Sequence, residues 1–225
     1  MNTEPETNSI SETDTNPTRK TSLKTSARTL WMVQTAVLVA ILIIMVIPIF
    51  PFGSLGFLRI PMTTISISLL SIPVVIGAII VGPACGAVLG GIFGITSFIQ
   101  CFTGDIFGAT LLGINPFLTF IMCMVPRILM GILVGLIFRA LSKIDKTKIV
   151  SFAVASLSGA VINTVLFVGA LILFFGTSDY LQSFGPNLPA ILGVLITINA
   201  AIEAAVCMVA GTAITKALSI TMKSK

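Results

Sequence analysis

Two ionisable residues, Arg127 and Glu203, each lie inside a long apolar stretch of the chain. Residues 117–138 carry no charge other than Arg127, and residues 190–215 carry none other than Glu203. Apolar stretches of this length are typical of helices that cross a hydrocarbon layer of ~30 Å. A charge near the middle of a bilayer is unfavourable by at least ~3 kcal/mol, so it is retained mainly where it is paired, hydrated or functional. The pattern therefore predicts a polytopic membrane protein with a polar site inside it.

The composition excludes an ordinary soluble domain. Hydrophobic residues make up 56% of the chain and charged residues 9%, against ~25% charged residues in soluble domains. The chain has no histidine, so we expect no metal, no cofactor and no Ser-His-Asp catalysis. Four cysteines lie in or beside apolar runs without a C-x-x-C pair and are expected to be packing residues: Cys85, Cys101, Cys123 and Cys207.

The apolar spans predict an all-α membrane protein folded as a six-transmembrane-helix bundle. The expected helices cover residues 30–50, 62–81, 84–102, 115–141, 149–175 and 189–218. Loops are expected at residues 103–114 and 176–188, with a tight turn at Gly82-Pro83. Residues 1–27 are rich in Thr, Ser, Asn and Glu, so we expect a disordered cytoplasmic tail ahead of one transmembrane domain over residues 28–225.

Basic residues predict the orientation of the bundle. They gather before the first span, between the fourth and fifth spans and after the last one, while the opposite side has Arg59, Asp105 and Asp179. Six helices place both termini on one side, and the positive-inside rule makes it the cytoplasmic side. The net charge of +5 is thereby explained by topology, and no nucleic-acid partner is expected.

Polar residues of several spans are expected to meet near the middle of the membrane. At ~1.5 Å of rise per residue, the deepest ones lie roughly 15–21 Å from the ends of their helices. Asn199 and Glu203 are four residues apart, so they share a helix face. The pattern favours an outward-leaning ligand cavity. Its deep candidates are Arg127, Asn163, Asn199 and Glu203, and its outer candidates are Thr96, Ser97, Gln100 and Asn115.

A structural alternative stays open for this polar layer. Arg127 and Glu203 can simply pair with each other while the asparagines bond across helices. Small residues leave a second alternative open, because Ala36 and Ala40 on the first span, and three glycines at four-residue spacing on the third, let helices approach closely. Those glycines, Gly86, Gly90 and Gly94, fit internal packing and a partner interface about equally.

Several motifs, taken in order, resemble the substrate-binding S component of energy-coupling factor (ECF) vitamin transporters. The run Ser-Ile-Pro-Val-Val-Ile-Gly-Ala-Ile-Ile-Val-Gly-Pro at residues 71–83 precedes the glycine-rich span. Val-Pro-Arg at residues 125–127 is followed by Gly131, and Asn163-Thr164 precedes Asn199 and Glu203. The Pro-Arg and Asn-Thr patterns most resemble the pantothenate-type members, while riboflavin, hydroxymethylpyrimidine and cobalamin members share the general pattern.

The resemblance implies a function and a set of partners. An S component in the bacterial plasma membrane captures one vitamin or precursor from outside, and it joins a shared T component and two ATPases. Such proteins are thought to topple in the membrane to release the substrate inside. In this chain Ala36 and Ala40 match the surface that meets the T component, and residues 52–68 match the outer gating loop.

Pantothenate fits the chemistry of the candidate residues. It has a carboxylate for Arg127, and an amide and two hydroxyls for Asn163, Asn199 and Gln100. Glu203 is expected to accept from a hydroxyl or to hold Arg127 in place. Two rivals from other classes are an intramembrane enzyme that uses Glu203 as an acid/base and a freestanding small-solute permease. The chain has no Walker A lysine loop of its own.

Overall fold

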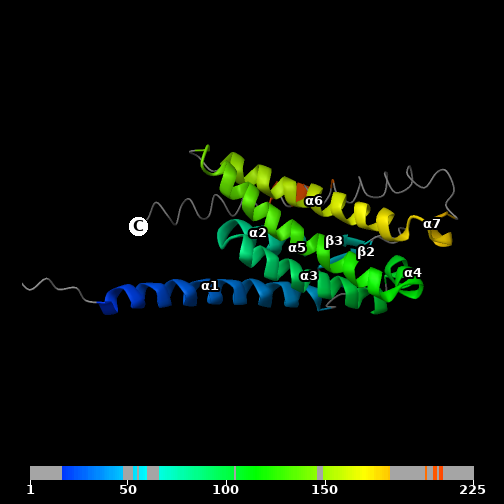
Figure 1. Cartoon of the computed structure of the whole chain (residues 1–225), viewed down its shortest axis with the longest axis horizontal. Helices are drawn as coiled ribbons and strands as arrows, with labels where there is room; N and C mark the ends of the chain where they lie inside the picture. Colours follow the sequence, from blue (N-terminus) through cyan, green and yellow to red (C-terminus); the bar gives the residue numbers. More distant parts are fainter. Residues whose placement is uncertain are drawn as a thin grey trace, which may run out of the picture.

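A computed structural model of the chain describes residues 17–47, 53–54, 56–59, 66–103, 105–145, 149–182, 201, 205–206 and 208–209. Four long helices dominate this part of the chain: α1 (Pro17–Val46), α3 (Pro83–Thr103), α5 (Pro116–Leu141) and α6 (Ile149–Phe175) (Figure 1). Each contains an apolar segment long enough to cross a membrane. A helical membrane bundle is therefore confirmed, whereas most of the sixth expected span lies outside the described residues.

The prediction for the second span was wrong. Residues 62–81 were expected to form one helix, but the chain first forms strand β3 (Ser66–Ser68) and only then the short helix α2 (Ser71–Ile80). Ten residues rise only ~15 Å, half of a membrane core. The Ser- and Thr-rich start of this segment favours extended pairing over a helix.

We expected an all-α protein, but a small antiparallel sheet precedes α2. Strand β2 (Phe57–Arg59) lies between β1 (Gly53–Ser54) and β3, with Phe57 opposite Ser68. The sheet falls in the segment that we expected to be the outer gating loop. The predicted Gly82-Pro83 turn is confirmed in outline, because Gly82 has a φ of 127°, which favours glycine.

Two further helices occupy segments that were expected to be loops. Helix α4 (Ile106–Ile114) begins after Asp105, whose side chain accepts a hydrogen bond from the Gly108 N–H at 3.2 Å. Such a cap satisfies a donor that the first turn of a helix leaves open. Helix α7 (Asp179–Gln182) follows α6. Helix α1 also begins earlier than the apolar span, since it extends over residues 17–27, where we expected disorder, and it has Pro17 at its first position.

The three glycines of α3 pack inside the bundle. A Cβ added to Gly86 would collide with the Gly131 carbonyl of α5, and one added to Gly90 would collide with the Arg127 carbonyl. At Gly94 an added Cβ would lie 2.9 Å from the Cys123 carbonyl oxygen. The two helices therefore approach backbone to backbone along a regular antiparallel register, which answers the question that the sequence left open for this stripe.

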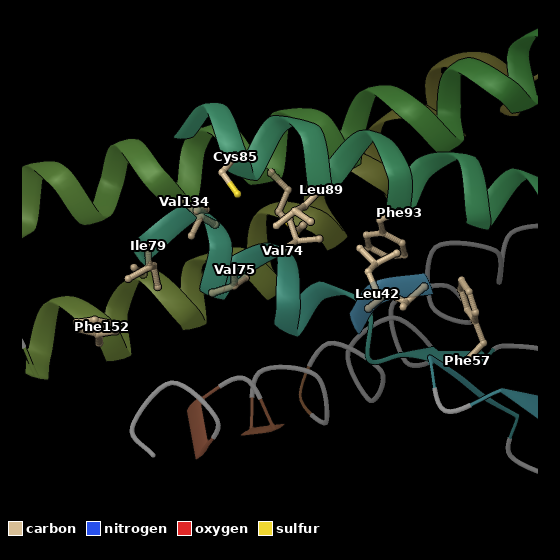
Figure 2. Packing of buried hydrophobic residues seen from close by; sticks show 14 residues of the cluster. Leu42, Phe57, Val74, Val75, Ile79, Cys85, Leu89, Phe93, Val134 and Phe152 are labelled. Atoms are coloured by element: carbon tan, nitrogen blue, oxygen red, sulfur yellow. The ribbon is translucent and has the colours of Figure 1, made fainter. Parts of the chain in front are cut away.

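Buried apolar side chains form two clusters. The larger one joins α1, α2, α3, α5 and α6, and Figure 2 shows Phe93 of α3 toward the end of it at which Phe57 lies. Phe57 of the small sheet packs against Phe93, with ring centroids 6.4 Å apart. The smaller cluster joins the N-terminal half of α5, the C-terminal half of α6, and α4 and α7: Leu111, Met122, Leu171, Phe175 and Leu181. Arg127 lies between these two regions of the fold.

Candidate ligand-binding site around Arg127

The conformation around Arg127 begins with the residue before it. Pro126 lies inside α5 and has no N–H, so it cannot donate to the Met122 carbonyl as a helical residue normally would. Arg127 Nη1 donates to that carbonyl oxygen instead, at 2.9 Å. The Pro-Arg pair thus opens the backbone ladder of the helix and closes the gap with a charged side chain.

Two aromatic rings from neighbouring helices lie against the guanidinium. Its central carbon, Cζ, is 5.6 Å from the ring centroid of Phe93 on α3 and 4.8 Å from that of Phe167 on α6. Both distances are within the ~6 Å range in which a cation is attracted to a ring face. Arg127 of α5 therefore lies where it meets α3 and α6.

Buried polar atoms without a hydrogen-bond partner occur on the same two neighbouring helices. In the described part of the chain they include Ser97 Oγ and Gln100 Oε1 on α3, and Asn163 Oδ1 on α6. A buried polar atom left in this state is unfavourable by ~1–3 kcal/mol, so it calls for an explanation. A ligand that donates hydrogen bonds to these oxygens would supply one.

Helical spacing relates these polar atoms to the two rings. Phe93, Ser97 and Gln100 follow one another at i, i+4 and i+7, so they share a face of α3. Asn163 and Phe167 are four residues apart and share a face of α6. Ser156 is seven residues before Asn163 on α6 and has a buried Oγ with no partner among the described residues. Helical spacing thus places Gln100 on the Phe93 face of α3 and Asn163 on the Phe167 face of α6, and both of these rings lie against Arg127.

The other predicted residues have different positions. Asn115 caps α5, since its Oδ1 accepts from the N–H groups of Phe117 and Leu118 at 3.1 and 3.2 Å. This task accounts for Asn115 without a ligand. Asn199 and Glu203 lie outside the described residues, so the expected pairing of Glu203 with Arg127 stays a prediction.

Helix α1 presents the two alanines that were expected to meet a partner. Ala36 and Ala40 are exposed, whereas Thr35 and Leu42 are buried on the side that packs against the bundle. Thr35 Oγ1 also donates to Cys85 Sγ of α3 at 3.4 Å. The alanine face of α1 is therefore directed away from the other described helices.

Sequence reasoning missed Phe93 and Phe167. Phenylalanine in a membrane helix carries no signal of its own, because most such residues face lipid or core. The usable signal was the spacing: each ring lies one helical turn from a polar residue that the sequence had singled out. The cysteines were predicted to be packing residues, and Cys85, Cys101 and Cys123 are buried free thiols.

Comparison with known proteins defines the class. The chain matches the family of ECF transporter substrate-specific components over residues 31–214, and it belongs to this family. It is accordingly a multi-pass bacterial membrane protein of a transport system. One curated relative is the pantothenic acid transporter PanT of Lactococcus lactis subsp. cremoris (strain MG1363), which is 29% identical over 161 residues, covering 68% of this chain and 77% of that protein.

Proposed function

We propose that this S component captures pantothenate from outside the cell and delivers it to the cytoplasm together with a T component and two ATPases. The observation that carries this proposal is the Arg127 guanidinium, set between Phe93 and Phe167 in the middle of a membrane helix. A positive charge in this position suits a ligand with a carboxylate. The name of the curated relative points to the same ligand.

The remaining polar atoms suit the other end of the ligand. Gln100 lies two helical turns, ~10 Å, beyond Phe93 along α3, and Ser97 lies one turn, ~6 Å, beyond it. These oxygens have no partner in the described part of the chain, and the hydroxyls and amide N–H of pantothenate are donors for them. We propose that the carboxylate binds Arg127 and that the hydroxyl end extends toward Gln100.

The proposed topology has six membrane helices with both termini in the cytoplasm. The sixth helix, over residues 189–218, would bring Asn199 and Glu203 into the same layer as Arg127. The small sheet of β1, β2 and β3 would lie at the outer side, where Phe57 already packs against Phe93. Movement of this sheet is the proposed gate, because it would uncover one wall of the site.

The described rings give little support for a large flat vitamin. A flat ring system such as riboflavin would need aromatic faces to stack on. The two rings nearest to the site, Phe93 and Phe167, both lie against Arg127. An S component for hydroxymethylpyrimidine or cobalamin is the remaining alternative within the family.

Binding and transport measurements with purified protein test this function. The detergent-solubilised chain alone is expected to bind pantothenate tightly by isothermal titration calorimetry, and to bind riboflavin weakly or not at all. Vesicles that contain only this chain are expected to show no uptake, whereas vesicles with the T component and ATPases take up pantothenate when ATP is inside. Uptake by the chain alone would instead support the freestanding permease.

A further inference from the structure

We propose that Phe93 and Phe167 are positioning residues that make the site selective for a carboxylate. This inference rests on the proposed function, because it concerns how the same site distinguishes an acid from a neutral ligand. Neither ring is required to touch the ligand. Their role is to fix the guanidinium of Arg127 in one orientation between α3 and α6.

An arginine side chain has several rotatable bonds, and ordering them on ligand binding lowers the affinity. In this site the ordering is largely done before a ligand arrives. Met122 O holds Nη1 at 2.9 Å, and one ring approaches from each of two other helices, at 4.8 and 5.6 Å from Cζ. Three helices therefore contribute to the position of one charged group.

The chemistry of the two aromatic rings matters for selectivity. A ring face attracts the cation through its quadrupole and contains no strong acceptor atom, so it does not take up an N–H group as a carboxylate does. A guanidinium carries five N–H donors in a planar fork that matches both oxygens of a carboxylate. Rings thus hold the charge in a way that is compatible with its binding an acidic ligand.

The rings are themselves fixed by the fold. Phe93 is 1% exposed and packs against Phe57 of the small sheet at 6.4 Å between centroids. Gly90, one turn before it, lets the α5 backbone approach α3 at Arg127. Phe167 packs against the smaller apolar cluster, which joins α4, α5, α6 and α7. Packing thus locks the rotamer of Phe93, whereas Phe167 is half-buried and is held by its contacts with that cluster.

Each ring also sets the distance between the charge and the neutral part of the site. Phe167 is one turn from Asn163, and Phe93 is one turn from Ser97, so each helix places a ring beside the cation and an oxygen ~6 Å along its axis. A carboxylate bound at Arg127 would therefore determine how far the neutral part of a ligand reaches along α3 and α6. Loss of a ring should release the charged end without removing the neutral contacts.

The test compares an acid with its matched alcohol. Pantothenol has a hydroxymethyl group where pantothenate has the carboxylate, and the rest of the two molecules is the same. We expect the wild-type full-length chain to bind pantothenate more tightly than pantothenol. Phe167→Leu and Phe93→Leu should each weaken pantothenate binding by about tenfold, which corresponds to ~1.4 kcal/mol, while pantothenol binding changes by less than about twofold. Phe167→Tyr should retain the acid preference, because tyrosine keeps the ring face.

Phe152→Leu is the matched control. Phe152 is also a buried phenylalanine of α6, but it packs against Phe138, with ring centroids 4.8 Å apart. Its loss should leave the ratio of the two dissociation constants unchanged. Equal weakening of both ligands in Phe167→Leu and Phe93→Leu, or no weakening of either, would overturn the positioning role while the proposed function stands. A wild-type chain that binds the alcohol as tightly as the acid would overturn the carboxylate selectivity, and one that binds neither would overturn the proposed function.

Discussion

At the scale of single residues, Arg127 has a structural task and a proposed ligand-binding task. The structural task follows from Pro126, which leaves the Met122 carbonyl without its helical donor, so that Arg127 Nη1 takes this place. A substitution of Arg127 alone mixes the two effects. They can be separated, because a backbone N–H at position 126 would perform the structural task without a charge.

Arg127→Ala is expected to lower stability by ~1–3 kcal/mol, since it leaves the buried Met122 carbonyl without its side-chain donor. In a Pro126→Ala background the same change should lower stability by ~1 kcal/mol less, because the new N–H of residue 126 bonds to that carbonyl, whereas the contacts with Phe93 and Phe167 are lost in both backgrounds. Thermal unfolding of the wild type, the two single variants and the double variant measures the coupling between positions 126 and 127. Pantothenate binding should stay lost in the double variant, and its recovery there would show that Arg127 is only a structural strut.

Asn163→Leu tests whether a buried oxygen is kept for a ligand. Asn163 is 9% exposed and its Oδ1 has no partner among the described residues. An apolar side chain of similar size should leave the empty protein as stable as before, or stabilise it by up to ~1 kcal/mol, while pantothenate binding weakens at least tenfold.

Asn115→Ala is the control for that substitution, with the opposite result expected. Removal of the α5 cap should destabilise the protein by ~1 kcal/mol and leave the affinity for pantothenate unchanged. Thermal melts and calorimetric titrations of both variants decide the point. Normal binding by Asn163→Leu would remove this residue from the site.

At the scale of secondary-structure elements, helix length decided how well the sequence predicted the fold. The third, fourth and fifth expected spans agree with α3, α5 and α6 to within a residue or so at each end, because long uninterrupted apolar runs have only one stable form in a bilayer. Short apolar segments are ambiguous: residues 106–114 form a helix and residues 66–68 a strand. Their conformation depends on a cap at Asp105 and on pairing with β2, which local pattern does not show.

In the candidate site, too, the residues that stand out in the local sequence could be recognised, and those whose role depends on packing could not. Arg127, Gln100 and Asn163 could be singled out as candidates because polar atoms are conspicuous in apolar runs, and their part in ligand binding stays a prediction. Phe93 and Phe167 could not, since their role comes from the packing of three helices. Asn115 was expected at the outer end of the site from its place at the start of the fourth span, and in the structure its side chain caps α5.

The packing of α3 against α5 offers a test at this scale. Gly90→Ala would place a methyl group against the Arg127 carbonyl, so the two helices must separate next to the site. We expect a loss of stability of ~1–3 kcal/mol and at least tenfold weaker pantothenate binding. Gly91→Ala is the control, because its Cβ would meet only side-chain atoms of Ile128 at 3.9 and 4.0 Å. Similar effects of the two variants would contradict the importance of this close approach.

At the scale of the whole molecule, the exposed face of α1 is the proposed contact with the T component. Ala36→Trp and Ala40→Trp should leave pantothenate binding by the isolated chain intact, because both residues are exposed and point away from the other described helices. Uptake by the complete transporter should fall at least tenfold, since a large ring prevents close helix approach. Ile41 is also exposed, but it lies roughly a third of a turn around α1 from the two alanines. Ile41→Trp should therefore retain uptake. Normal uptake by both alanine variants would place the partner surface elsewhere.

The small molecules that co-purify with this S component test most directly whether it holds an acidic vitamin at Arg127. Mass spectrometry of extracts from the detergent-solubilised wild-type chain, prepared from its native host, should recover pantothenate at close to one molecule per chain. The Pro126→Ala/Arg127→Ala variant, which is expected to fold, should recover none. Recovery of a vitamin without a carboxylate, or of pantothenate from both proteins alike, would contradict the account.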